Sequence, residues 1–243
     1  MHDYGFDINI DGKMYKVPII CECKKRKTLV LRIIPKNMQV IFSMPVGTPK
    51  SYADSFFEKS KPWLAKQLEK ILPCVKIHDY MENDSFYYLG SELPLKIRSG
   101  RKNSAHIEGG CIFIEQKTEL SADQKKALLE KMFTRELEDL LKESFSYVSQ
   151  KFKQYIGERE PDIKIRKMTA KWGLCRPLKN QMTFSSRLVH VSPELIDYVM
   201  AHELCHFVHA NHSKAFWALL EKGMPAWCDF RQKLGEMDKY IDI

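Results

Sequence analysis

Two histidines and a glutamate that could bind and use a metal ion stand in the run His-Glu-Leu-Cys-His, residues 202–206 of the 243-residue sequence. On a helix, residues four apart lie one turn apart on the same face, so the imidazoles of His202 and His206 can reach one ion. Glu203 follows the first ligand and can act as the general base toward a water molecule at the metal. The types and spacing of these residues predict metal-assisted hydrolysis, with Zn²⁺ as the ion.

A third ligand must come from outside this run, because a catalytic zinc ion has three protein ligands and one open position. His209 and His212 are the two candidates. His209 lies about 10 Å beyond His202 along a straight helix, which is too far for one ion. Asn211 can adopt the left-handed conformation that ends a helix, and the chain can then fold His212 back toward the metal. We therefore predict His212 as the third ligand and His209 as a neighbour at the rim.

The segments around these residues carry the signals of helix boundaries. Ser192-Pro193-Glu194 predicts a helix start, with a capping Ser, a Pro in the first turn and an acid at the positive end of the helix dipole. This helix should run over 193–210. Ser213 predicts the cap of a second helix that ends near residue 223, and a third helix is predicted over 225–234.

The preceding sequence predicts a β-rich part followed by a mixed part. Alternating apolar residues predict strands over 13–23 and 28–43 with Pro35-Lys36-Asn37 as a hairpin turn, a helix over 51–72, and strands over 86–97 and 106–114 with Gly109-Gly110 as a turn. A long helix is predicted from a cap at Ser121 to about Phe152, then short strands over 163–168 and 182–188 with a loop over 172–181 between them. We expect an α+β protein with a β-rich part and one helix over 1–118 and a second part over 119–243, without an internal repeat.

Composition narrows the class of protein. Seven cysteines at irregular spacing, without a CxxC pair, argue against a disulfide framework and a four-cysteine zinc site. Free thiols suit a reducing compartment, and the first residues lack the pattern of a signal peptide, so a cytoplasmic protein is expected. No 18-residue apolar run predicts a membrane span. The net charge of +8 is compatible with nucleic acid as a partner, but the lysines are spread along the chain, which favours a solvated lysine-rich surface.

A family resemblance rests on several of these motifs. The run 198–206, followed by Asn211-His212-Ser213 and Phe216-Trp217, resembles the YgjP-like metallopeptidase family, whose pattern is an HELxH helix, five residues, then His-Ser and Phe-Trp. The segment 171–175 is similar to the family's WGSC segment, with Leu174 where members usually carry Ser. The early hairpin, Lys61-Pro62-Trp63 and Tyr88-Leu89-Gly90 extend the resemblance over nearly the whole chain.

The resemblance implies a zincin-like domain over 119–243, related in outline to SprT-like proteases. It also implies that His202, His206 and His212 hold zinc and that Glu203 is catalytic. The implied activity is that of a metallopeptidase, which hydrolyses a peptide or an unfolded protein through a zinc-activated water. A UTP pyrophosphatase activity is also attributed to the family, so a nucleoside triphosphate is the alternative substrate.

Further residues bear on the choice of substrate. Trp172, Arg176 and Arg187 are candidate substrate contacts. A pocket ringed by Arg166, Lys171 and Arg187 would suit a triphosphate, because Arg binds phosphate with a fixed fork of donors. An exposed strand edge beside the helix would suit a peptide. A third hypothesis, a nucleic-acid-associated protein with a structural zinc, conflicts with Glu203, since a structural site has four protein ligands and needs no base. Two further residues, Phe216 and Trp217, have the spacing of core residues.

Overall fold

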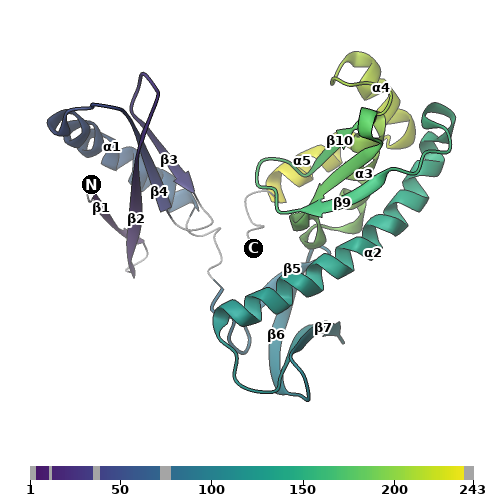
Figure 1. Ribbon diagram of the computed structural model, residues 1–243, viewed down its shortest axis with the longest axis horizontal. Coiled ribbons are helices and arrows are strands. Elements are labelled where there is room, and N and C mark those ends of the chain that lie inside the picture. Colours follow the sequence, from purple (N-terminus) through teal and green to yellow (C-terminus); the bar gives the residue numbers. More distant parts are fainter. Residues whose placement is uncertain (1–3, 11–12, 35–38, 72–77, 238–243) are drawn as a thin grey trace. The chain divides into compact units, whose positions relative to one another are not determined.

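The computed structural model describes residues 4–10, 13–34, 39–71 and 78–237 (Figure 1). The chain divides after Lys76 into two compact units, here called the N-terminal unit and the C-terminal unit. The boundary predicted from the sequence, at 118/119, lies inside the C-terminal unit. Within the described part of the chain, every helix is too short or too polar to cross a membrane.

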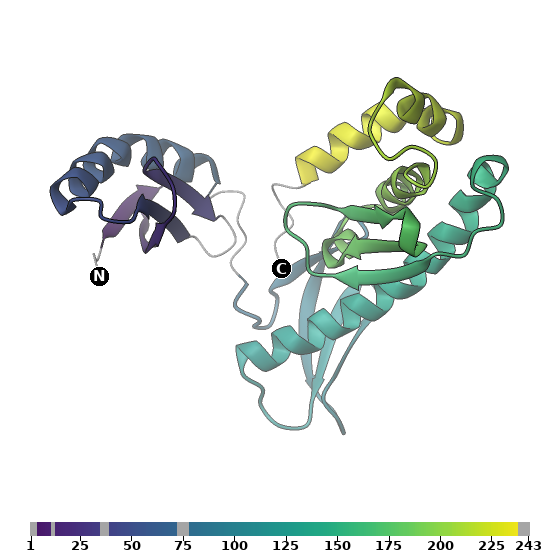
Figure 2. The ribbon, with the colours of Figure 1, turned by 45° about the horizontal axis from the view of Figure 1, so that its top comes forward.

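The N-terminal unit is a four-stranded sheet with one helix across one face (Figure 2). Its elements are β1 (Gly5–Ile10), β2 (Lys13–Lys24), β3 (Val30–Ile34), β4 (Gln39–Pro45) and α1 (Lys50–Ile71). The strand order is β1-β2-β4-β3, in which β2 and β4 pair in parallel and the other pairs are antiparallel. Phe42 and Leu64 are fully buried between sheet and helix. The predicted hairpin is confirmed as β3–β4, whereas its turn at residues 35–37 lies outside the described residues, and β1 was not anticipated.

The C-terminal unit opens with a second four-stranded sheet. Its strands are β5 (Ser85–Tyr88), β6 (Ser91–Ser99), β7 (Ser104–Glu108) and β8 (Cys111–Gln116). The order is β5-β6-β8-β7, with β6 and β8 parallel and the other pairs antiparallel. Gly109 and Gly110 both have positive φ, at 54° and 75°, and form the predicted two-residue turn. The strand arrangement of the first sheet therefore recurs, although no repeat was found in the sequence.

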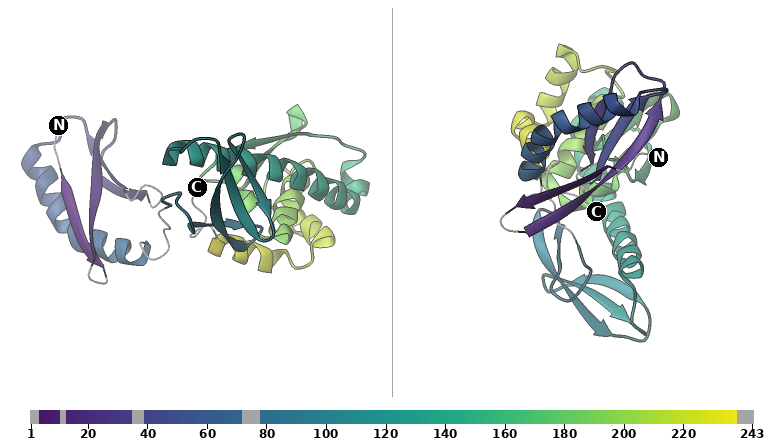
Figure 3. Two further views of the ribbon diagram at one scale, coloured as in Figure 1. Left: turned by 90° about the horizontal axis from the view of Figure 1, so that it is seen from below. Right: turned by 90° about the vertical axis from the view of Figure 1, so that its left-hand side faces the viewer.

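The long helix α2 (Ala122–Ile156) follows this sheet and lies against it (Figure 3). The predicted cap is confirmed, because the Ser121 side chain accepts from the Gln124 N–H while the Gln124 side chain accepts from the Ser121 N–H. A continuous stripe of buried residues along α2 contacts β7 and β8 first and α3 and α4 further on. Six of the seven cysteines lie in the described residues and are free thiols, and Cys74 lies outside them.

The rest of the unit is a three-stranded sheet and three helices. Its elements are β9 (Asp162–Arg166), β10 (Gly173–Arg176), η3 (Pro177–Lys179), β11 (Gln181–Ser185), η4 (Ser186–His190), α3 (Pro193–Cys205), α4 (Lys214–Gly223) and α5 (Trp227–Met237). The order β10-β11-β9 leaves β10 at an edge. The loop predicted over 172–181 was wrong in part, because β10 pairs with β11 there. The helix predicted over 193–210 ends at Cys205, since the chain turns at His206. The predicted Ser213 cap is confirmed.

Candidate metal centre and active site

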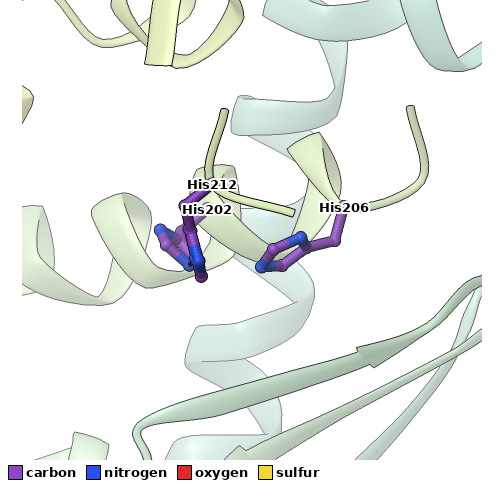
Figure 4. Close-up of side chains that lie close together, drawn as sticks. All are labelled: His202, His206 and His212. Carbon is purple, nitrogen blue, oxygen red and sulfur yellow. Dashed lines mark hydrogen bonds between the residues drawn. The ribbon is translucent and has the colours of Figure 1, made fainter. Parts of the chain in front are cut away.

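Three imidazoles converge at the end of α3 (Figure 4). His202 lies in the last turn of α3, His206 is its C-cap residue, and His212 belongs to the segment that precedes α4. One nitrogen of each ring lies within 4.8 Å of the others, and the Nε2 atoms of His202 and His212 are 2.9 Å apart. The structure thus brings together the three predicted ligands from a helix and a following loop.

Because α3 ends at Cys205, the following turn also orients the ring of His206. His206 Nδ1 lies 3.0 Å from the backbone carbonyl oxygen of His209, so a protonated Nδ1 donates to that oxygen and leaves Nε2 to bind a metal. His209 therefore contributes its carbonyl, and its own ring is not a member of the histidine cluster. This matches the neighbouring position expected for His209.

The electrostatics favour the neutral form of His202 and His206, which is the form that binds a metal. Burial is the main cause that lowers the pKa of His202 to about 3, and His206, His212 and the nearby Arg231 cation contribute to the same decrease. Burial is also the main cause that lowers the pKa of His206. Neutral imidazole nitrogens close together are a typical donor set for zinc. The chemistry of these residues therefore fits a divalent cation such as Zn²⁺.

Glu203 lies beside the cluster on α3 and is nearly inaccessible, with 4% of its surface exposed. Its carboxylate accepts a hydrogen bond from the Cys175 backbone N–H. Burial raises the pKa of Glu203 to about 8, while the Cys175 N–H and the Lys171 cation act in the opposite direction. Within the described residues its Oε2 atom is buried without a hydrogen-bond partner. An unpaired buried carboxylate oxygen is costly, so this atom suits a partner that arrives with a metal or a substrate.

The backbone of β10 passes directly over Glu203. A Cβ atom added to Gly173 would lie 2.5 Å from Glu203 Oε1 and 2.7 Å from its Cγ, which is closer than real Cβ contacts. Only glycine fits this position without a shift of the carboxylate. Two residues on, burial and the Glu203 charge raise the pKa of the Cys175 thiol to about 12. Cys175 therefore stays a thiol at neutral pH and is a poor nucleophile.

A cavity of about 530 Å³ opens beside the cluster. Residues from the β10 region, α3, the following loop and α5 line it, and they are Lys171, Trp172, Gly173, Leu174, Cys175, Pro177, Tyr198, Val199, His202, Glu203, His206, Ala210, His212 and Leu234. Most of these side chains are apolar. Lys171 is the one Lys or Arg among them. The cavity thus joins a cluster of metal ligands and a buried base to an apolar wall.

The three candidate substrate contacts have different positions. Trp172 lines the cavity, whereas Arg176 and Arg187 do not. The Arg187 guanidinium lies 4.4 Å from the centre of the Trp172 ring and its Nη1 donates to the Thr169 carbonyl oxygen at 3.3 Å. Arg187 is buried, and its cation packs against the Trp172 ring and does not face the cavity.

Several residues of the site were missed from the sequence. Phe216, expected in the core, is fully buried, and its ring centre lies 4.8–4.9 Å from the ring centres of all three histidines. Gly173 and the Cys175 N–H matter through their backbone, which side-chain patterns do not reveal. Phe216 could have been assigned to the site from the sequence, because it lies one helical turn after the Ser213 cap, and Ser213 directly follows His212.

Comparisons with known proteins identify one family and one similar solved structure. The family described as "YgjP-like, metallopeptidase domain" matches residues 27–237. No curated protein matches the chain. Among solved structures, the crystal structure of the metallopeptidase zymogen abylysin from Pyrococcus abyssi matches with 19% sequence identity and a TM-score of 0.35. That match covers 44% of this chain and 98% of the abylysin chain.

Proposed function

Because the chain belongs to the YgjP-like metallopeptidase family, we propose that it hydrolyses peptide bonds with a zinc ion held by His202, His206 and His212 and with Glu203 as the general base. The proposal rests on the buried Glu203 carboxylate, which has one oxygen without a hydrogen-bond partner among the described residues and which lies on α3 next to His202, with His206 as the C-cap residue of the same helix. A structural zinc site would have four protein ligands and no adjacent base.

Each residue has a separate role in this reaction. Zinc held by the three imidazoles would polarise the scissile carbonyl and favour the ionisation of water. Glu203 takes a proton from the attacking water and delivers it to the leaving amine. Burial makes the carboxylate a stronger base by raising its pKa, and the Cys175 N–H fixes its orientation.

The strand β10 supports a peptide as the substrate. It is an edge strand, and its residues Gly173 and Cys175 line the cavity beside the histidines. An extended peptide can add to an exposed sheet edge through main-chain hydrogen bonds, while a pocket accepts one of its side chains. The apolar wall formed by Trp172, Leu174 and Val199 suits an apolar side chain next to the scissile bond.

The nucleotide alternative has less support from the cavity. Of the three basic residues expected around a triphosphate, Lys171 lines the cavity, while Arg166 and Arg187 are not among its lining residues. Phosphate groups in buried sites are usually held by several charge-assisted hydrogen bonds, often from Arg. A single Lys provides fewer such bonds, so we favour the peptide.

The test compares turnover of an unfolded protein and of UTP by the zinc-loaded chain, beside two variants of α3. Glu203→Gln removes the base, and we expect peptide hydrolysis to fall by about 10²–10⁴-fold with zinc still bound. Glu194→Gln changes an exposed acid in the first turn of the same helix and should leave turnover unchanged. Release of pyrophosphate from UTP that is lost in Glu203→Gln, without peptide hydrolysis, would replace the peptidase proposal with the nucleotide one.

A further inference from the structure

His212 differs from the other two histidines of the cluster because no helix holds it. His202 and His206 are fixed by α3, whereas His212 is exposed and lies in the segment between α3 and α4. An exposed loop residue has many conformations, and ordering it when a ligand binds costs binding free energy. Something else must therefore hold His212 in place if it is to bind a metal tightly.

Trp217, in the first turns of α4, makes two contacts that could do so. Its Nε1 atom donates a hydrogen bond to the backbone carbonyl oxygen of His212 at 3.0 Å. Its ring also stacks on the His212 imidazole, with ring centres 5.5 Å apart and an angle of 24° between the planes. One side chain thus restrains both the main chain and the ring of His212.

Trp217 itself packs against side chains of α5. Its ring stacks on Trp227 of α5, with centres 4.4 Å apart and planes at 19°, and the Arg231 guanidinium lies 5.1 Å from its centre. The Ser213 cap fixes the start of α4, because the Ser213 hydroxyl accepts from the Phe216 N–H. The position of His212 is therefore tied through Trp217 to two helices.

We infer that Trp217 is a positioning residue that holds His212 in ligand geometry before a metal binds. The inference rests on the metal site of the proposed function. Partners that orient a metal ligand typically change metal affinity by 10–100-fold, because they remove the cost of ordering the ligand. Trp217 acts through His212 and does not line the cavity, so its effect is on metal binding and not on the bond that is cleaved.

The test is a double-mutant cycle that measures the zinc dissociation constant of the full chain by competition with a chromophoric chelator. Trp217→Leu should weaken zinc binding by about 10–100-fold in the parent. In a His212→Ala background the same change should have no further effect, because the ligand that Trp217 positions is gone. General loosening of the fold would weaken binding equally in both backgrounds, and that result would overturn the inference.

Two further variants keep the test decisive. Trp63→Leu changes a half-exposed tryptophan of the N-terminal unit and should leave zinc affinity unchanged. If Trp217→Leu does not fold, as judged by circular dichroism, Trp217→Phe keeps a ring but lacks the Nε1 donor and should still bind zinc more weakly than the parent. Parental affinity in Trp217→Phe would then overturn the inference.

The inference and the proposed function can fail separately. A parent protein that binds no zinc would sink both. A parent that binds zinc and hydrolyses peptides in a Glu203-dependent way, with a Trp217→Leu variant that binds zinc equally well, would sink the inference alone.

Discussion

The two four-stranded sheets have the same strand arrangement but lead to different structures. In β1–β4 and in β5–β8, two antiparallel pairs are joined by one parallel pair in the middle, and a helix follows the fourth strand. The helix after the first sheet, α1, has 22 residues, whereas α2 has 35. The first sheet and helix make up the described structure of the N-terminal unit, whereas α2 continues past its sheet.

The extra length of α2 makes it the support of the metal centre. It contacts β7 and β8 of its sheet and also η4, α3 and α4. The Ser144 hydroxyl of α2 donates to Asp197 of α3 at 2.6 Å. His202 and Glu203 lie on α3. Because α2 continues beyond its sheet and packs against α3, it also supports these two residues of the site. The same strand arrangement can therefore form a complete unit or support further elements, depending on how far its helix continues.

The largest expected effect is on zinc affinity, and it should distinguish two histidines of the C-terminal unit. His202→Ala removes a ligand, and zinc affinity should fall by more than the 10–100-fold typical of residues that only orient ligands. His106→Ala changes a residue of β7, in the second sheet, and should leave affinity unchanged. Zinc titration with a competing chelator measures both. If the parent and His202→Ala bound zinc with equal affinity, His202 would not be a metal ligand and the proposed metal centre on α3 would be wrong.

A smaller effect is expected from glycines of the two units. Gly173→Ala forces Glu203 to move, because the added Cβ would lie 2.5 Å from Oε1. Displacement of a catalytic group by about 1 Å can cost about 10²-fold in rate, so we expect turnover to fall by about that factor. In Gly5→Ala of β1, the added Cβ meets no atom of the described residues within 4 Å, so this variant is the matched control. The rate of steady-state peptide hydrolysis by the two variants is the measurement that tests this prediction. Full activity in Gly173→Ala would contradict this description of the site.

A matched pair of leucines tests the comparison of the helices directly. Leu64 of α1 and Leu141 of α2 are both fully or almost fully buried, and each change to Ala should cost about 2–5 kcal/mol of unfolding free energy. Only Leu141→Ala should also weaken zinc binding, since α2 supports α3. Denaturant unfolding and zinc titration measure the two quantities. Similar zinc loss in both variants would mean that the N-terminal unit also supports the site.

The smallest expected effect comes from removal of the metal. A ligand at 100 times its dissociation constant stabilises the folded state by about 2.7 kcal/mol, and a chelator should remove this contribution. We expect the loss in the C-terminal unit, where the histidines lie, and no change in the N-terminal unit. Hydrogen exchange read separately for the two units distinguishes these outcomes. Equal destabilisation of both units would show that their stabilities are coupled.

The helical half of the site could be predicted from the sequence because its signals are local. The spacing of His202 and His206 places both residues on one face of a helix. Ser121 and Ser213 are caps that directly precede the first residues of α2 and α4. The position of His212 followed from the length limit of a straight helix. These predictions needed no knowledge of distant parts of the chain.

The other half of the site depends on contacts between distant residues. The strand β10 is four residues long, begins with a glycine and is followed by Pro177, so it has no alternating pattern and was predicted as loop. Its pairing with β11 and its approach to Glu203 are tertiary contacts. The grouping of the strands β5–β8 with the helix α2 was also not predicted from the sequence. The reason is similar, because the residue pattern of a strand does not show which helix will pack against its sheet. The contacts of Trp217 also lie beyond what helical spacing can show.

The packing of α2 has a consequence for how this chain can be shortened. Residues 85–116 form the sheet whose strands β7 and β8 contact α2, and α2 in turn contacts the helix of the metal ligands. A fragment cut at residue 119 would keep the histidine cluster but would expose to water the apolar surface of α2 that this sheet covers. Such a fragment would be prone to aggregate. We therefore expect that a shortened chain has to begin close to residue 77, where the C-terminal unit begins, to keep the metal centre folded.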